Sequence, residues 1–184
     1  MYRIHTKLRT VEGVVLSRKN YHEADKVVTL FTKELGIIRA VAKGVRKIKS
    51  RRAPHLEVFT RCLVTLYEGS TLPSITEVSS LANYDAIRSD LSKVSYAYFY
   101  CELILLLLAD GQEHADVYFL LVNALDALSS ETGAVQSRIF VLELLWTLGF
   151  LPRSEHLSGT KLQAFVESVA ERRMKTPAMV KFLS

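Results

Sequence analysis

The first 80 residues have the pattern of short β-strands, and part of them shows the two-residue period of apolar and polar positions that marks a half-buried strand. Residues 56–69 show it most clearly, because one side of that segment carries Leu56, Val58, Thr60, Cys62, Val64 and Leu66. Four other segments are rich in β-branched and aromatic residues and predict strands at residues 11–18, 26–32, 37–42 and 72–78. Five short strands joined mostly by short turns fit a small closed barrel, and we expect an OB-fold.

The hydrophobic period changes to that of helices from Asp85 onward. It predicts helices over residues 86–109, 114–128 and 134–148, and a fourth from Ser158 through Arg172. Gly149 and Pro152 follow the third helix in the order typical of a helix end, with glycine first and proline beyond it. The sequence therefore predicts an α+β chain, with an OB-fold domain at residues 1–80 and an all-α helical bundle at residues 81–184.

The net charge of +5 is distributed unevenly along the chain. Residues 1–80 contain 15 Lys and Arg against 7 Asp and Glu, whereas residues 81–184 contain 9 against 12. Such an asymmetry indicates two units with different partners, of which the basic one faces a polyanion. Nucleic acid is the favoured partner, and a membrane surface is disfavoured because no basic stretch is also a strongly amphipathic helix.

Most of the excess positive charge falls between Glu34 and Glu57, a stretch without any acidic residue. Its cations are Arg39, Lys43, Arg46, Lys47, Lys49, Arg51 and Arg52. Clustered Lys and Arg side chains bind phosphates through charge-assisted hydrogen bonds and release counterions from the nucleic acid. Gly44 permits a sharp turn after the strand at residues 37–42, which would project the cations off the barrel. We therefore predict that these seven residues bind DNA, against the alternative of a solvated run of charges.

Two tyrosines beside predicted turns, Tyr21 and Tyr67, are candidates for stacking on unpaired bases. The segment YHEAD, which begins at Tyr21, brings His22, Glu23 and Asp25 close together and suggests a metal or acid–base site. Residue types at this spacing are generic, and no second cluster completes a coordination sphere. We therefore favour a turn in which Glu23 and Asp25 accept hydrogen bonds.

No other chemistry is indicated by the sequence. Cys62 and Cys101 are far apart among apolar neighbours, which favours buried side chains over a disulfide or a zinc site. Without a glycine-rich phosphate loop, a nucleophile elbow or a paired-acid nuclease motif, the sequence predicts no catalytic residue, no metal and no cofactor. The N-terminus lacks the apolar region of a signal peptide, and the apolar run at residues 103–109 is far shorter than the roughly 20 residues that span a bilayer. We expect a soluble cytoplasmic protein.

A set of short motifs points to one known family, namely Glu12-Gly13, Glu23-x-Asp25, Thr32-x-Glu34-x-Gly36, Ala42-Lys43-Gly44-x-Arg46 and Lys49-Ser50-Arg51. With these motifs, residues 11–59 resemble the N-terminal domain of the bacterial DNA-repair mediator family RecO. The segments YAYFYCELILLL and RIFVLELLWTLGFLP are similar to that family's first long helix and to the helix that precedes its late insertion. The resemblance extends through residue 152, weakens beyond it and returns faintly at RRMKTPAMVKFL.

The resemblance implies an OB-fold followed by a helical domain, in a protein that binds single- and double-stranded DNA and anneals complementary strands. It also implies work with RecR and the single-stranded DNA-binding protein SSB to load RecA onto coated gaps, in the cytoplasm with the nucleoid. The family is not classed as an enzyme. An acidic SSB tail would require cations on the helical domain, for which the candidates are Arg138, Arg172 and Arg173.

One departure from the family pattern concerns zinc. Many members carry a four-cysteine zinc ribbon after an LG-x-x-P segment, whereas here Leu148-Gly149-x-x-Pro152 is followed by RSEHLSGTKL, which has no cysteine. The resemblance therefore implies a short member without the ribbon. Two alternatives of other classes stay open, an OB-fold RNA-binding module and a non-catalytic adaptor whose cations bind an acidic protein. A hydrolase or nuclease is least favoured, because no acid–base or metal cluster occurs.

Overall fold

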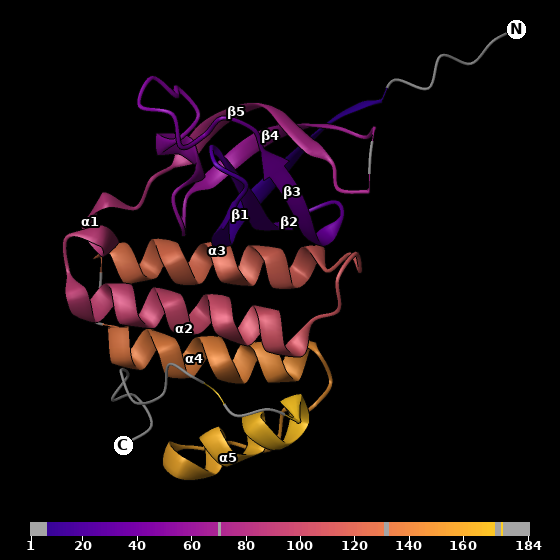
Figure 1. Cartoon of the computed structure of the whole chain (residues 1–184). Helices are drawn as coiled ribbons and strands as arrows, with labels where there is room; N and C mark the ends of the chain where they lie inside the picture. The colour runs from indigo at the N-terminus through magenta and orange to yellow at the C-terminus, as the bar shows by residue number, and fades with distance from the viewer. Residues whose placement is uncertain (1–6, 70, 131–132, 172–173, 175–184) are drawn as a thin grey trace, which may run out of the picture. The chain divides into compact units, whose positions relative to one another are not determined.

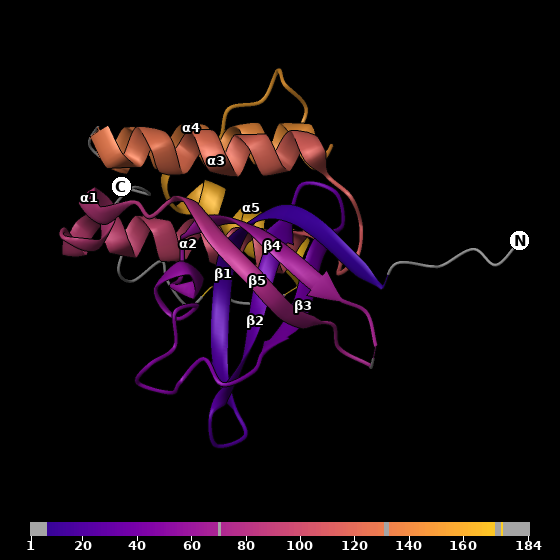
Figure 2. The ribbon, with the colours of Figure 1, turned by 90° about the horizontal axis from the view of Figure 1, so that it is seen from above.

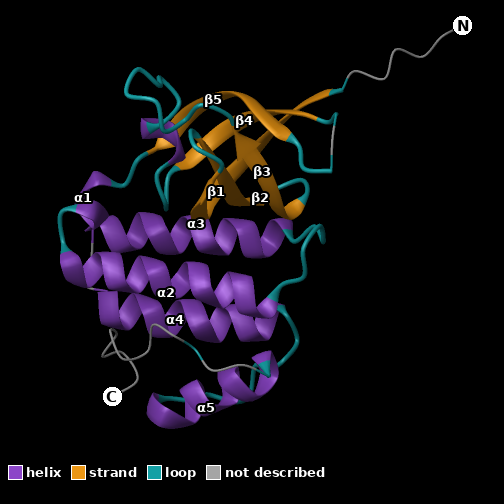
Figure 3. Ribbon diagram, viewed as in Figure 1, coloured by secondary structure: helices purple, strands orange, loops and turns teal. Residues whose placement is uncertain are grey.

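The computed structural model describes residues 7–69, 71–130, 133–171 and 174. It contains two compact units. The first unit comprises residues 1–83 together with residues 110–113, and the second comprises residues 84–109 and 114–184. All five strands belong to the first unit, and helices α1 to α5 belong to the second (Figure 3).

The first unit is a closed five-stranded barrel (Figures 1 and 2). Its strands are β1 (Leu8–Tyr21), β2 (Asp25–Thr32), β3 (Gly36–Ala42), β4 (Arg61–Tyr67) and β5 (Ser74–Ala82). They pair in the order β1-β2-β3-β5-β4, and β4 pairs back to β1. Neighbouring strands are antiparallel except β3 and β5, which are parallel where Val41 pairs with Ser74. The predicted OB-fold is confirmed.

The long strand β1 closes the barrel because it pairs with β4 through its first half and with β2 through its second. The register of its pairing with β2 shifts between Val15 and Ser17, which marks a β-bulge. A bulge bends a strand and increases its twist, as a small closed barrel requires. The interior is filled by apolar side chains from all five strands and the loop after β3, namely Val11, Val15, Val28, Leu30, Ala40, Ala42, Val45, Leu56, Cys62, Val64, Leu66 and Ile75.

The predicted strand over residues 56–69 is wrong at its first residues, because β4 begins at Arg61. Pro54–Leu56 instead form the short 3-10 helix η1, whose Leu56 side chain enters the barrel core. Phe59 has a φ of 75°, far from the values of an extended strand, and its amide donates a 2.8 Å hydrogen bond to the Val15 carbonyl oxygen. The hydrophobic alternation thus identified buried side chains here but not the backbone conformation.

A four-residue piece from further along the chain, the 110–113 segment, belongs to the barrel unit. Asp110 forms a parallel bridge with Ile37, and the Gly111 amide donates a 2.8 Å hydrogen bond to the Ile37 carbonyl oxygen. Gly36, at a φ of 64°, lies directly beneath this segment, and a Cβ added to it would meet the Gln112 carbonyl group. Glycine is therefore required at the start of β3 for two reasons: the positive φ disfavours other residues, and no room is left for a Cβ atom.

The second unit contains α1 (Asp85–Arg88), α2 (Leu91–Leu107), α3 (Ala115–Ser130), α4 (Gly133–Thr147) and α5 (Gly159–Ala170). The single helix predicted over residues 86–109 is divided in the structure, because Asp90 interrupts it with extended backbone. Its carboxylate caps α2, where Oδ1 accepts hydrogen bonds from the amides of Ser92 at 2.8 Å and Lys93 at 3.2 Å. Arg172, the predicted end of the last helix, lies outside the described residues.

Glycine ends α4 as predicted. Gly149 has a φ of 75°, its amide donates to the Trp146 carbonyl oxygen at 3.1 Å, and the Phe150 amide donates to the Leu145 carbonyl oxygen at 2.9 Å. This pair of bonds is the Schellman arrangement that satisfies the last carbonyl groups of a helix. None of the described helices combines the length and apolarity that crossing a membrane requires.

Three buried groups with raised pKa values lead to a prediction about alkaline pH. Burial raises the pKa of the Cys62 and Cys101 thiols to about 12. Burial also raises the pKa of Tyr100 to about 12, with a smaller lowering effect from its hydrogen bond with Ser137 and a smaller raising effect from Tyr96. The unfolded chain releases these protons first as pH rises, so the folded state binds more protons above about pH 9. The free energy of unfolding should therefore fall with rising pH, by up to roughly 1.4 kcal/mol per pH unit for each titrating group.

Urea unfolding between pH 8 and pH 11 measures this slope. A variant with both Cys62→Ala and Cys101→Ala should be less stable at pH 8 but should lose stability less steeply above pH 9. An identical slope in the two proteins would contradict the assignment to the thiols.

Candidate nucleic-acid interface

The basic loop, residues 43–52, leaves β3 through a turn fixed by the YHEAD segment. Gly44 has a φ of 66°, and its amide donates a 2.7 Å hydrogen bond to Asp25 Oδ1 at the start of β2. The predicted role of Asp25 as an acceptor in a turn is confirmed. For Glu23 the acceptor is the backbone carbonyl oxygen, which receives a 2.9 Å hydrogen bond from Arg46 Nη1. Among the residues that the structure describes, His, Cys, Asp and Glu side chains nowhere gather as a metal site requires.

Two of the predicted cations hold this loop against the barrel. The Arg46 amide donates to the Ala24 carbonyl oxygen at 2.9 Å, in addition to its side-chain bond to the same turn. Arg52 donates from Nη1 to the Ile75 carbonyl oxygen on β5 and from Nη2 to the Lys43 carbonyl oxygen, both at 2.6 Å. A backbone carbonyl oxygen is neutral, so it accepts a hydrogen bond from a guanidinium group without cancelling its positive charge. Both arginines therefore shape the loop while they add to its positive charge.

Arg39, in contrast, has a carboxylate partner. It lies on β3 opposite Thr29 of β2 and forms a salt bridge with Asp110 in the 110–113 segment. The side chains are 52% and 51% exposed, so the pair contributes little to stability. Its effect is electrostatic, because the carboxylate offsets the charge at this position. The acid-free stretch between Glu34 and Glu57 does not reveal this partner of Arg39, because Asp110 lies 71 positions further along the chain.

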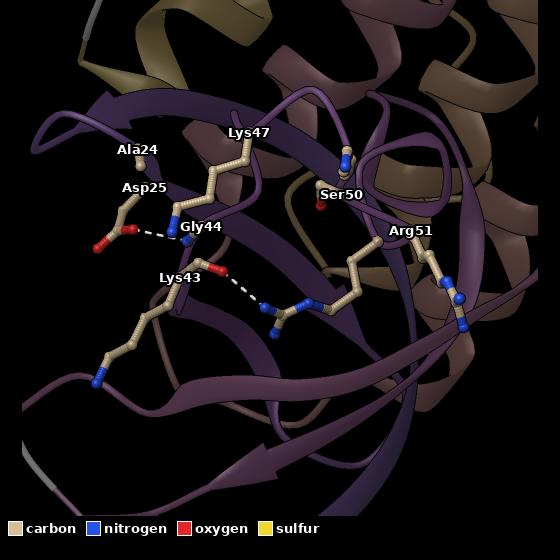
Figure 4. Close-up of a pocket in the computed structure, with 9 residues that line it drawn as sticks. Ala24, Asp25, Lys43, Gly44, Lys47, Ser50 and Arg51 are labelled. Carbon is tan, nitrogen blue, oxygen red and sulfur yellow. Dashed lines mark hydrogen bonds between the residues drawn. The ribbon is translucent and has the colours of Figure 1, made fainter.

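Four cations project from the basic loop, namely Lys43, Lys47, Lys49 and Arg51. All four are exposed, and none forms a salt bridge with any described residue. They line an open hollow with a volume of about 640 Å³, together with Ala24, Asp25, Gly44, Ser50 and Arg52. Figure 4 shows Lys43 and Arg51 leaving the loop in different directions, while Lys47 extends across Gly44. Unpaired cations around a concave surface create the positive potential that attracts a polyanion.

Lys26, which is not among the cations predicted from the sequence, extends this positive surface onto β2. The β2–β3 register places it opposite Ala42, where the basic loop begins. Its pKa is lowered, first by partial burial and then by the guanidinium groups of Arg18 and Arg46, while Glu57 acts in the opposite direction. Arg18 itself forms a salt bridge with Glu57. If the two predicted strands are paired outward from the short turn between them, the first residue of one, Lys26, falls opposite the last residue of the other, Ala42. This pairing would have identified Lys26 from the sequence.

The two predicted stacking tyrosines lie at different turns. Tyr21 ends β1, is 40% exposed and packs edge-on against His22 with ring centroids 4.0 Å apart. It therefore borders the β1–β2 turn that the basic loop contacts. Tyr67 ends β4 opposite Leu8, is 41% exposed, and has Lys7 Nζ 6.0 Å from its ring centroid. Of the two, Tyr21 is the one that the structure places beside the basic loop.

The cations considered for an acidic protein tail fall on the helical unit. Arg138 is exposed on α4. Arg172 and Arg173 lie outside the described residues. Of the three, Arg138 is the one whose exposure the structure shows, and its contact with an acidic tail stays a prediction.

Comparison with known proteins identifies related sequences along almost the whole chain. The family described as "Recombination protein O N terminal" matches residues 7–84, and "Recombination protein O C terminal" matches residues 88–178. The boundary between these matches falls near the boundary between the barrel and the helices.

Curated relatives carry the name DNA repair protein RecO. The protein of Symbiobacterium thermophilum is 33% identical over 147 residues, which are 79% of this chain and 58% of the relative. That of Bifidobacterium longum subsp. infantis is 38% identical over 146 residues, 77% of this chain and 61% of the relative. That of Roseiflexus sp. is 34% identical over 143 residues, 77% of this chain and 50% of the relative. This chain thus spans between half and about three-fifths of the length of these relatives. An OB-fold barrel, a following helical unit and both family matches together establish that the chain belongs to the recombination protein O (RecO) family.

Proposed function

We propose that this chain is a DNA repair and recombination mediator, which binds single- and double-stranded DNA through the basic loop and anneals complementary strands. The observation that carries the proposal is a set of four exposed cations on one loop of an OB-fold, none of which has an acidic partner among the described residues, namely Lys43, Lys47, Lys49 and Arg51. Membership of the RecO family supports the same conclusion, because its curated relatives are named DNA repair proteins.

The proposed mechanism is electrostatic. Annealing brings two phosphate backbones together, and their mutual repulsion opposes the approach. Cations of the basic loop bind phosphates of the first strand, release its counterions and so reduce the repulsion of the second. Each phosphate contact should contribute about −0.7 to the slope of log affinity against log salt for single strands, so four contacts should give a slope of about −3. No covalent step is required, and we propose that the chain is not an enzyme.

The helical unit is proposed to serve protein partners. Its residues carry more acidic than basic charge, which suits protein contacts better than phosphate contacts. We infer that RecR and SSB are these partners and that RecA is loaded indirectly, at the nucleoid where the DNA lies. Arg138 on α4 offers an exposed positive charge to an acidic SSB tail.

A strand-annealing assay with complementary labelled oligonucleotides tests the proposal. The chain should accelerate annealing of bare DNA, and with RecR it should also accelerate annealing of SSB-coated DNA, in both cases less at higher salt. Competition between DNA and RNA of matched sequence belongs to the same experiment. A clear preference for RNA would favour an RNA-binding module instead. Binding to neither nucleic acid would favour an adaptor for an acidic protein, and either result would contradict the proposal.

A further inference from the structure

The basic loop carries one apolar side chain in full contact with solvent. Ile48 is 104% exposed, and its neighbours in sequence are Lys47 and Lys49. The Ser50 amide donates a 2.9 Å hydrogen bond to the Lys47 carbonyl oxygen, which closes a β-turn with Ile48 at its second position. Such positions usually carry Pro, Gly, Asn, Asp or Ser, because these residues favour the turn geometry. Neither the barrel core nor the turn therefore accounts for an isoleucine here.

The turn that presents Ile48 is firmly attached to the barrel. Val45, three residues before it, is 5% exposed and belongs to the barrel core. The Lys47 amide donates to the Gly44 carbonyl oxygen at 3.2 Å, and Arg46 is bonded to the β1–β2 turn. Because these hydrogen bonds fix the backbone on both sides of Ile48, a partner that covers this side chain has less of the loop to order.

We propose that Ile48 inserts between neighbouring bases of bound DNA and unstacks them, while the cations beside it bind the adjacent phosphates. Any surface that covers Ile48 must also accept the charge of Lys47, Lys49 and Arg51, which lie within three residues of it. DNA provides apolar base faces next to phosphates at every nucleotide, and branched aliphatic side chains beside cations act as wedges between base steps in other DNA-binding proteins. An aliphatic side chain suits insertion better than flat stacking, for which aromatic rings serve.

This inference rests on the proposed DNA binding and adds a step to it. A strand whose bases are held partly unstacked presents their pairing edges to a complementary strand. The same contact supplies affinity that does not depend on salt, because burial of an apolar side chain releases no counterions. Affinity should therefore have two separable parts, one from the cations and one from Ile48.

Binding of a single-stranded oligonucleotide that contains 2-aminopurine tests the inference, because the emission of this base rises when it is unstacked. The intact chain should increase the emission, and Ile48→Ala should abolish most of the increase. Ile48→Ala should also lower affinity about tenfold at every salt concentration, with the salt slope unchanged. Ile48→Leu should restore both signals, since it restores a branched aliphatic side chain. The thermal midpoint should stay the same in each variant, because the side chain is fully exposed.

Leu91→Ala provides the matched control, because Leu91 is an 80% exposed aliphatic residue at the start of α2 in the other unit. It should change neither emission nor affinity. Equal emission from Ile48→Ala and the intact chain would overturn the insertion, even if affinity fell. A chain that binds no DNA would instead overturn the proposed function itself, so the two failures are distinguishable.

Discussion

Replacing Lys47, Lys49 and Arg51 with glutamate is expected to lower the affinity for single-stranded DNA by at least about 100-fold. Each side chain is exposed without an acidic partner among the described residues, so the change removes three phosphate contacts and adds repulsion. The slope of log affinity against log salt should become shallower by about 2. The thermal midpoint should hardly change, because exposed substitutions usually alter stability by less than about 0.5 kcal/mol. Fluorescence anisotropy over a salt titration, with thermal unfolding in parallel, measures both effects.

The matched control places the same change of charge on the helical unit. Arg138, Arg153 and Lys161 are exposed there, and their joint replacement with glutamate alters the net charge equally. If only the overall charge attracts DNA, both triple variants should lose affinity alike. If the basic loop is the binding surface, the control should retain most of the affinity. Equal losses would therefore contradict the assignment of the interface.

Arg46 and Arg52 are left intact in this test for a structural reason. Their guanidinium groups bond backbone carbonyl oxygens, so reversing either would both remove a positive charge and unfasten the loop. A loss of DNA binding in such a variant would have two explanations. The three chosen side chains avoid that ambiguity because, among the described residues, none of them forms a hydrogen bond or salt bridge that holds the loop.

Gly36→Ala is expected to destabilise the barrel by about 3 kcal/mol or more, through two effects at one residue. At a φ of 64° any L side chain is strained. In addition, the new Cβ would overlap the Gln112 carbonyl oxygen and lie 2.6 Å from its carbon, which is backbone and cannot turn aside. The 110–113 segment would have to separate from β3. Urea unfolding should show a lower midpoint, and a cooperative transition of the barrel should be retained.

Gly111→Ala separates the two effects, because Gly111 has a φ of 73° with no atom within 4 Å of the added Cβ. This variant should show the conformational strain alone, about 1 kcal/mol. A similar loss in both variants would mean that the 110–113 segment moves freely and that its contact with β3 is unimportant to stability.

Much of the barrel was predictable because β4 has one buried side and one exposed side, whereas β2 and β3 are mostly buried and rich in β-branched and other apolar residues. The arrangement of β4 produces the alternation seen in residues 61–67, and the same signal stays strong where the backbone departs from a strand, as at Leu56. The hydrophobic pattern did not show that residues 54–56 form a 3-10 helix and not a strand, since a buried apolar residue is compatible with either conformation. The break before α2 was visible in principle, because Asp90 is a typical N-cap residue, but the helical pattern that follows, from Tyr96 to Leu107, was extended back across it.

The candidate interface was predictable as a concentration of charge but not as a geometry. Whether a cation faces solvent, a carboxylate or a carbonyl oxygen depends on partners that the fold brings from a distance. Asp110 reaches Arg39 from 71 positions away, and Arg52 bonds a carbonyl oxygen of β5, a partner that every residue type provides. Neither contact can be recognised from the residues near Arg39 or Arg52 in the sequence. Ile48 could have been singled out, since an isoleucine between two lysines is unusual in a segment predicted to be neither strand nor helix.

The placement of residues 110–113 has a practical consequence for anyone who isolates the barrel. A fragment cut after β5 would leave behind four residues that complete the edge of β3. The Ile37 carbonyl oxygen would lose its amide donor, and Arg39 would lose its counterion. Such a fragment would carry one more unbalanced guanidinium than the parent and would overstate its electrostatic attraction to polyanions, so titrations made with it alone would exaggerate how tightly the intact protein holds nucleic acid.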